Sequence, residues 1–485
     1  MKKGLKQTKI IATLGPASDS PEVLKSMIDA GVDLIRINAS HCPNAESIQT
    51  IINLVRAVSE EVEVPLGIFL DLQGPKVRVG TFADGAIKLE VGDTFRLSAD
   101  KSTPGDQNVV SVSYPELISD LEVGHHLFID DGNIRLEVTT KAPNEVVCNV
   151  IRGGKVSNNK GINLPMTKTS IPTLTEKDLR DLKVAVDNQL EYVAHSFVST
   201  ADDVKLLKKH IETMGGVDIG VIAKIERKAA VDNIISIIKN VDVVMVARGD
   251  LGVEIGIENV PEAQKLIISE ASLLIKPVIV ATQMLESMVE KKLATRAEVS
   301  DVANAIYDRC DAVMLSGETA TGIDPANAVA MMRTICVATD QSLTARKKNK
   351  FSQVKRVFEE KTMATSFCKA ADAIADENDA DVILAFTSSG NTPLISSKLS
   401  PSIPIIAPTD SIHVLKKMQM YRGVIPIMMP QPFSEIKSWA RMIDVAIRYA
   451  KMQGLMEVGD KVVITAGFPI GQPGGTNSIR MVIVS

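Results

Sequence analysis

The chain has 485 residues, of which 45% are hydrophobic and 23% are charged, and its formal net charge is −5. This length exceeds what one hydrophobic core organises, so two to four domains are expected. The mild negative charge excludes a general attraction to nucleic acid or anionic membranes, so any anion site must be local. The N-terminal segment lacks an apolar signal core and no run is long enough to cross a membrane, so we expect a cytoplasmic protein.

Short apolar strands alternate with amphipathic helices in two parts of the chain. Strands are expected at residues 10–13, 34–38, 66–71, 192–196, 219–225, 243–247, 278–281 and 312–316. Eight such strand and helix units are what a (β/α)8 TIM barrel requires, and catalytic side chains in that fold lie at the C-terminal ends of the strands.

Two further segments interrupt or follow this pattern. Residues 75–172 show alternating strands and turn signals, which predict an inserted β-barrel lid domain between barrel parts 1–74 and 173–344. Barrel character returns near Thr175, where the sequence is typical of a helix start. A charged stretch at 346–350 marks the start of a C-terminal α/β domain, residues 345–485, with strands at 382–387, 403–407 and 462–466. The five cysteines form no CxxC pair, and most of them are predicted to be small core residues.

Two acids and a lysine stand at the ends of neighbouring predicted strands. Lys224 and Glu226 end one apolar run, and Asp250 follows the next. Because parallel strands end at one edge, we expect the three groups to lie together. Carboxylates with substrate oxygens hold Mg²⁺ or Mn²⁺, and an ammonium balances phosphate charge, which indicates phosphoryl or enolate chemistry. The alternative is a buried structural cluster of ion pairs.

The chain resembles the pyruvate kinase family over essentially its whole length. Ten matching segments occur in family order, at residues 8–10, 14–18, 36–41, 71–76, 160–165, 174–178, 247–252, 281–285, 295–299 and 314–319. The resemblance implies transfer of the phosphoryl group of phosphoenolpyruvate to ADP, giving pyruvate and ATP in glycolysis. It also implies a homotetramer with a barrel, a lid and an effector domain.

The resemblance assigns roles around the substrate. Lys224 matches the family's transition-state lysine, and Glu226 and Asp250 match its divalent-metal ligands. The backbone at Gly249 can approach the substrate closely, because no side chain intervenes. Thr282 resembles the threonine that contacts substrate, within a possible proton relay, although its spacing equally suits a helix N-cap.

Arg36 and a set of nucleotide contacts complete the predicted substrate site. Arg36 ends the second strand, where a guanidinium can grip a phosphate in two places. Asn38, His41, Arg78 and Lys160 match the family's ATP contacts, although His41 alone would more often be a structural hydrogen bonder. Neither a P-loop nor a kinase glycine loop occurs, so side chains and metal must hold the phosphates.

The segment 71–76 departs from family members that require potassium. They carry Asp-Thr-Lys-Gly-Pro-Glu, whereas this chain ends the segment with Lys76. An ammonium among the oxygens of Asn38, Ser40, Asp71 and Leu72 would supply the charge of a monovalent cation without the ion. We therefore predict K⁺-independent activity and a place in the bacterial lysine-type subset of the family.

A polar loop in the C-terminal domain resembles the family's effector phosphate loop. It consists of Thr387, Ser388, Ser389, Gly390, Asn391 and Thr392. The loop precedes a helix expected near Pro393, whose exposed N–H groups would bind an anion such as AMP or a sugar phosphate. A plain turn is the alternative. Residues 467–476 could close over the same ligand, and Met166 replaces a glycine of the family's lid motif.

Two other functions are compatible with parts of this pattern. A metal-dependent aldolase or lyase that forms a pyruvate enolate would need neither the lid lysine nor the nucleotide contacts. A catalytically inactive regulatory homologue is the second alternative. The presence of the charged residues assigned to the substrate and the metal argues against inactivity.

Overall fold

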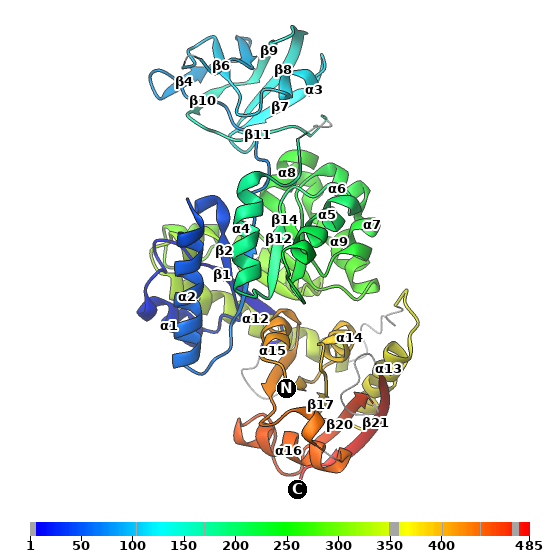
Figure 1. Ribbon diagram of the computed structural model, residues 1–485. Helices are drawn as coiled ribbons and strands as arrows, with labels where there is room; N and C mark the ends of the chain where they lie inside the picture. The colour runs from blue at the N-terminus through cyan, green and yellow to red at the C-terminus, as the bar shows by residue number, and fades with distance from the viewer. Residues whose placement is uncertain are drawn as a thin grey trace.

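The first and central parts of the chain form a closed barrel of eight parallel strands in the computed structural model (Figure 1). The structure describes residues 6–102, 104–165, 167, 171–348, 358–399, 401–436, 438–467 and 475–485. Around the barrel the strands run β1 (Lys9–Thr13), β16 (Ala312–Leu315), β15 (Val278–Ala281), β14 (Val243–Ala247), β13 (Gly220–Ile225), β12 (Tyr192–His195), β3 (Gly67–Asp71) and β2 (Leu34–Asn38). The predicted TIM barrel is confirmed, and every predicted barrel strand agrees within one residue at each end.

Helices surround the barrel and follow its strands. They are α1 (Pro21–Ala30), α2 (Ala45–Glu61), α4 (Glu176–Asp187), α5 (Ala201–Thr213), α6 (Lys228–Asp232), α7 (Ile234–Asn240), α8 (Arg248–Ile255), α9 (Val260–Leu273), α10 (Arg296–Tyr307), α11 (Gly317–Ala320) and α12 (Pro325–Lys348). Local signals explain where several begin: Thr175 and Asp178 form a capping box before α4, and Thr295 and Glu298 form another before α10. Helix α8 follows β14 without a loop, which places Asp250 in its first turn.

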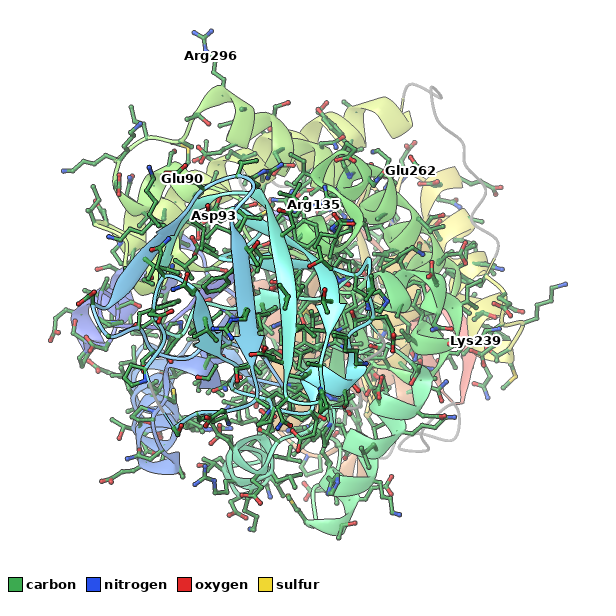
Figure 2. All side chains as sticks on the ribbon, turned by 90° about the horizontal axis from the view of Figure 1, so that it is seen from above. Glu90, Asp93, Arg135, Lys239, Glu262 and Arg296 are labelled. Atoms are coloured by element: carbon green, nitrogen blue, oxygen red, sulfur yellow. The ribbon has the colours of Figure 1, made fainter. Side chains whose placement is uncertain are left out.

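A separate β domain lies above the barrel between β3 and β12 (Figure 1). Its strands are β4 (Ala86–Leu89), β5 (Thr94–Ser98), β6 (Val109–Ser111), β7 (His126–Ile129), β8 (Ile134–Lys141), β9 (Glu145–Arg152), β10 (Gly154–Ser157) and β11 (Ile162–Asn163). A six-stranded sheet in the order β11-β7-β8-β9-β5-β6 and a two-stranded sheet of β10 and β4 enclose one apolar core. One short helix, α3 (Leu117–Asp120), was not expected there. Figure 2, seen from above, shows this domain over the barrel, with Glu90, Asp93 and Arg135 on it.

The connection into the β domain needs a glycine at one position. Gly74 has φ +66°, a left-handed conformation, and a Cβ there would lie 2.9 Å from the Cβ of Ser196. Its N–H donates to Asp178 at 3.0 Å, which ties the connection to α4. Met166, on the return connection, lies outside the described residues.

The C-terminal domain is a five-stranded sheet with helices, at the opposite end of the barrel from the β domain (Figure 1). The sheet order is β19 (Val424–Met428), β18 (Ile405–Thr409), β17 (Val382–Ala385), β20 (Lys461–Gly467) and β21 (Thr476–Ile483), and only the β20–β21 pair is antiparallel. Its helices are α13 (Met363–Glu377), α14 (Asn391–Leu399), α15 (Ile412–Lys417) and α16 (Trp439–Met452). Strands β19 and β21 were not predicted from the sequence.

The predicted start of the C-terminal domain differs from the structure. Residue 345 lies inside α12, which continues to Lys348, because arginine and lysine favour a helix as readily as a linker. Residues 349–350 of the predicted charged linker lie outside the described residues. All five cysteines are free and buried, whereas only most of them were predicted to be core residues. None of the described helices combines the length and hydropathy needed to cross a membrane.

Candidate active site

Lys224 is the centre of an ionic cluster at the C-terminal end of the barrel. Its Nζ lies 3.2 Å from Oδ1 of Asp71 and 2.9 Å from Oε1 of Glu226, and it donates to Oγ of Ser196 at 2.9 Å. The sequence analysis did not name Ser196, although its position at the end of a predicted strand was a signal. Burial lowers the pKa of Lys224, but the charges of Asp71 and Glu226 outweigh it and raise this pKa above its ordinary value. Lys224 therefore stays a cation at every working pH.

Arg36 lies beside Asp71 at the ends of β2 and β3. Its Nε and Nη2 both donate to Oδ2 of Asp71, at 2.8 and 2.6 Å, and Nη1 donates to Thr13 at 3.2 Å. Burial raises the pKa of Asp71, but Lys224 and Arg36 outweigh that and hold it below its ordinary value. A guanidinium carries five N–H groups, so Arg36 keeps two for a bound anion.

Glu226 and Asp250 form the carboxylate side of the cluster. Glu226 is 1% exposed, and its Oε2 accepts from the backbone N–H of Phe197 at 2.6 Å. Burial raises the pKa of Glu226 and the neighbouring Asp250 adds to this shift, so a cation bound between the two acids would relieve an unfavourable charge. The described residues contain no group of three or more His, Cys, Asp or Glu able to hold a metal. These two carboxylates suit a hard dication that takes its other oxygen ligands from substrate or water.

Lys76 does not lie where the sequence analysis placed it. Its Nζ is 3.3 Å from Oδ1 of Asp250 and 3.9 Å from Oδ1 of Asp131, and no contact among the described residues joins it to Asn38, Ser40, Asp71 or Leu72. Asp71 already accepts from Arg36 and Lys224, so a third cation there would gain less than one beside Asp250. The ammonium is nevertheless within the ionic cluster.

Thr282 follows β15 and contacts the turn after β14. Its Oγ1 accepts from the N–H of Gly249 at 2.9 Å and donates to the carbonyl of Ala281 at 2.6 Å. The helix N-cap alternative is wrong, because Thr282 and Gln283 have φ of 69° and 54° and the next helical turn begins only at Glu286. A Cβ on Gly249 would lie 3.7 Å from Oγ1 of Thr282, so the glycine keeps the space beside this hydroxyl open.

The four predicted nucleotide contacts lie on two sides of the barrel mouth. Asn38 and His41 belong to the short helix η1 (Ala39–His41) and its cap, where Oδ1 of Asn38 accepts from the N–H of Ser40 at 3.2 Å. On the β domain, Arg78 donates to the carbonyl of Asn159 at 2.9 Å, and Lys160 lies 2.6 Å from Asp130. Among the described residues no direct contact joins the two pairs.

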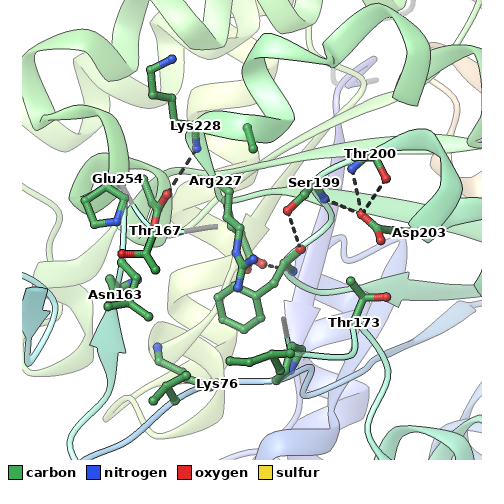
Figure 3. Close-up of a pocket in the computed structure, with 18 of the residues that line it drawn as sticks. Lys76, Asn163, Thr167, Thr173, Ser199, Thr200, Asp203, Arg227, Lys228 and Glu254 are labelled. Carbon is green, nitrogen blue, oxygen red and sulfur yellow. Dashed lines mark hydrogen bonds between the residues drawn. The ribbon is translucent and has the colours of Figure 1, made fainter. Parts of the chain in front are cut away.

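A cavity of about 620 Å³ lies where the β domain meets the barrel (Figure 3). Lys76 lines it from the connecting segment, and Glu226, Arg227 and Glu254 line it from the barrel. Arg227 stacks on the ring of Phe197 at 5.3 Å, and Glu254 accepts from the N–H of Lys228 at 3.4 Å (Figure 3). Arg227, Phe197 and Glu254 were not predicted from the sequence. They belong to the site because they line this cavity, and hydrophobic periodicity does not specify which residues at the barrel mouth face it.

The predicted effector loop joins β17 to α14. The N–H groups of Ser389 and Gly390 donate to Oγ1 of Thr387 at 3.3 and 2.8 Å, and Gly390 has φ +85°. Helix α14 begins at Asn391, two residues before the expected start. The hydroxyls of Thr392 and Thr476 lie 2.6 Å apart, so β21 reaches this loop, while residues 468–474 lie outside the described residues.

Comparisons with known proteins identify the family of this chain. The family model "Pyruvate kinase, barrel domain" matches residues 5–329, and "Pyruvate kinase, alpha/beta domain" matches residues 365–482. A pyruvate kinase of Methylorubrum extorquens is 41% identical over 100% of this chain and 98% of its own length. A pyruvate kinase of Geobacillus stearothermophilus is 40% identical over 99% of this chain and 81% of its own length. A crystal structure of a pyruvate kinase from Cryptosporidium parvum matches with a TM-score of 0.90 and 33% identity, covering 99% of this chain and 96% of that one. The chain belongs to the pyruvate kinase family, whose members are phosphotransferases that generally use a divalent metal.

Proposed function

We propose that this protein transfers the phosphoryl group of phosphoenolpyruvate to ADP, giving pyruvate and ATP in cytoplasmic glycolysis. The observation that carries the proposal is the position of Lys224, between the buried carboxylates of Asp71 and Glu226 at the C-terminal end of the barrel. Phosphoryl transfer spreads negative charge over the transferred oxygens, so fixed cations at this place lower the barrier.

Each residue has a defined task in this proposal. Arg36 grips the phosphate of phosphoenolpyruvate with its remaining N–H groups, and Lys224 stabilises the charge that develops during transfer. Glu226 and Asp250 would hold Mg²⁺ or Mn²⁺, which supplies further neutralisation of the phosphoryl oxygens when bound. After transfer, enolpyruvate gains a proton at its methylene carbon, and the hydroxyl of Thr282, which accepts from the N–H of Gly249, would relay it.

Nucleotide and monovalent-cation requirements follow from the barrel mouth. ADP would lie between two pairs of residues, Asn38 and His41 on the rim of the barrel and Arg78 and Lys160 on the β domain. Closing the gap between these pairs would move the β domain toward the barrel. K⁺ independence is supported by Lys76, whose ammonium lies 3.3 Å from Asp250 and supplies a positive charge within the ionic cluster. On this account the chain belongs to the lysine-type subset of the family.

Regulation and assembly complete the proposal. A phosphorylated effector such as AMP or a sugar phosphate would bind the loop 387–392, which leads into the N-terminus of α14 at Asn391 and carries the hydroxyl of Thr387. A homotetramer would allow this site to influence the barrel through subunit interfaces.

A coupled assay tests the reaction. ATP formation from phosphoenolpyruvate and ADP is expected with Mg²⁺ or Mn²⁺, and no formation with either ion would overturn the proposal. Pyruvate-enolate chemistry that proceeds without ADP would instead identify a lyase. The variant Lys224→Met is expected to lose at least about 10²- to 10³-fold in kcat, the loss typical of removing one charge-stabilising group. Lys239→Met is the matched control, because Lys239 forms an exposed ion pair with Glu359 and lies near the rim of the molecule in Figure 2.

A further inference from the structure

Thr282 is held in a backbone conformation that its side chain disfavours. Thr282 and Gln283 have φ of 69° and 54°, so two consecutive residues that are not glycine lie in the left-handed region. A β-branched residue rarely adopts this conformation, and such residues persist only where surrounding contacts determine them. The contacts that hold this turn are therefore part of how Thr282 is presented.

Arg248 supplies most of those contacts. Its Nη2 donates to the carbonyls of Thr282 and Gln283 at 2.8 and 3.2 Å, and its Nε donates to the carbonyl of Thr282 at 3.3 Å. On the other side, Nη1 lies 2.8 and 2.7 Å from the two carboxylate oxygens of Asp301 on α10. The Arg248 side chain is 9% exposed, so one planar group is fixed between α10 and the turn after β15.

The residue after Arg248 fixes the other end of Thr282. The N–H of Gly249 donates to Oγ1 of Thr282 at 2.9 Å. Two consecutive residues at the start of α8 thus hold the carbonyl and the hydroxyl of the same threonine. Because Gly249 and Asp250 share this first turn of α8, the same contacts set the position of the hydroxyl relative to the carboxylate of Asp250.

We infer that Arg248 is a positioning residue: it holds Thr282 in the left-handed conformation, so that the hydroxyl faces the reacting substrate. The inference rests on the proposed role of Thr282. Lysine cannot replace Arg248, because one ammonium on a flexible stem lacks the rigid fork that reaches two carbonyls and a carboxylate together.

The first experiment compares Arg248→Lys with Arg448→Lys. Arg448 is a matched control, because it forms an exposed pair with Asp444 at 2.7 Å on α16. Arg248→Lys is expected to lower kcat by about 10²-fold, the loss typical of a catalytic group displaced by about 1 Å, with a much smaller change in KM for phosphoenolpyruvate. Arg448→Lys is expected to leave both unchanged. Wild-type kcat in a folded Arg248→Lys variant would overturn the inference.

A double-mutant cycle separates positioning from a general structural role. If Arg248 acts through Thr282, adding Arg248→Lys to Thr282→Ala lowers kcat little further, whereas independent effects multiply and would overturn the inference. Full activity of Thr282→Ala alone would overturn the proposed role of Thr282 and this inference with it. If Arg248→Lys does not fold, judged by its thermal midpoint, Asp301→Asn takes its place in the cycle. It loosens the guanidinium and is expected to lower kcat only when Thr282 is present.

Discussion

Replacing Lys224 by methionine removes the cation that lies between two buried carboxylates. Asp71 and Glu226 are each 1% exposed, and Lys224 lies within 3.2 Å of both. Removing one partner of a buried ion pair costs about 3–5 kcal/mol, because the remaining charge is left without compensation. At about 2–4 °C per kcal/mol for a unit of this size, the thermal midpoint should fall by about 6–20 °C at pH 8.

The pH dependence identifies which carboxylate carries this cost. Asp71 keeps its bonds from Arg36, whereas among the described residues Glu226 keeps only the bond from the N–H of Phe197, so Glu226 is the carboxylate left without a cation. Burial already raises the pKa of Glu226 above its ordinary value in the folded protein. A carboxyl group whose pKa is higher in the folded than in the unfolded state contributes to stability at low pH, and this contribution is lost as the pH rises through the folded-state pKa. The midpoint of Lys224→Met should therefore approach the wild-type value as the pH falls from 8 toward the ordinary carboxyl pKa.

Differential scanning calorimetry at several pH values measures this directly. The double variant Lys224→Met, Glu226→Gln removes the unpaired charge and should recover part of the midpoint at pH 8 without recovering activity. Lys239→Met is the control and should change the midpoint little, since exposed ion pairs contribute about 0–1 kcal/mol. A double variant no more stable than Lys224→Met at pH 8 would refute the reasoning about the unpaired carboxylate.

Three further predictions concern ions and effectors. Turnover should be nearly equal in K⁺ and in Na⁺ buffer, while Lys76→Glu should make it K⁺-dependent; a tenfold or greater rise of wild-type activity with K⁺ would contradict this. Metal affinity, measured by titration with Mn²⁺, should fall about tenfold per pH unit below the raised pKa of Glu226, because metal and proton compete for it, and Glu226→Gln should lack this slope. Gly390→Ala forces alanine into φ +85° and should weaken activation by AMP or a sugar phosphate. Gly454→Ala is the control, because Gly454 has φ +68° but lies outside the loop 387–392, and it should not weaken activation. Equal effects of the two variants on activation would argue against an effector site in this loop.

The barrel could be predicted closely because its strands are continuous apolar runs with polar residues at their ends. The strands β2, β14 and β15 agree residue for residue with the prediction. Strands β19 and β21 were missed, since β21 is an edge strand with a mostly half-buried pattern and β19 contains a proline. Helix α12 continues past the predicted domain boundary at residue 345, because charged residues do not stop a helix.

The identities of the site residues could be predicted more easily than their partners. The end of a strand places a side chain at the barrel mouth, so Arg36, Asp71 and Lys224 could be assigned to one region. Which acid each cation contacts depends on side-chain reach across several strands, which no spacing in the sequence specifies. The left-handed turn at Thr282 was equally inaccessible, because neither Thr282 nor Gln283 carries a signal for positive φ.

Charge balance explains why these side chains pair as they do. Three cations, Arg36, Lys224 and Lys76, face three carboxylates, Asp71, Glu226 and Asp250, so the ionic cluster has no net charge of its own. A divalent cation and an anionic phosphate ester carry charges of opposite sign, so binding both together would change the net charge of the ionic cluster little. Lys76 is the cation whose position would depend most on this exchange, because a metal held by Asp250, as proposed, would repel an ammonium 3.3 Å from the same carboxylate. Since Lys76 lies on the connection into the β domain, metal binding at Asp250 would be electrostatically linked to the position of that connection.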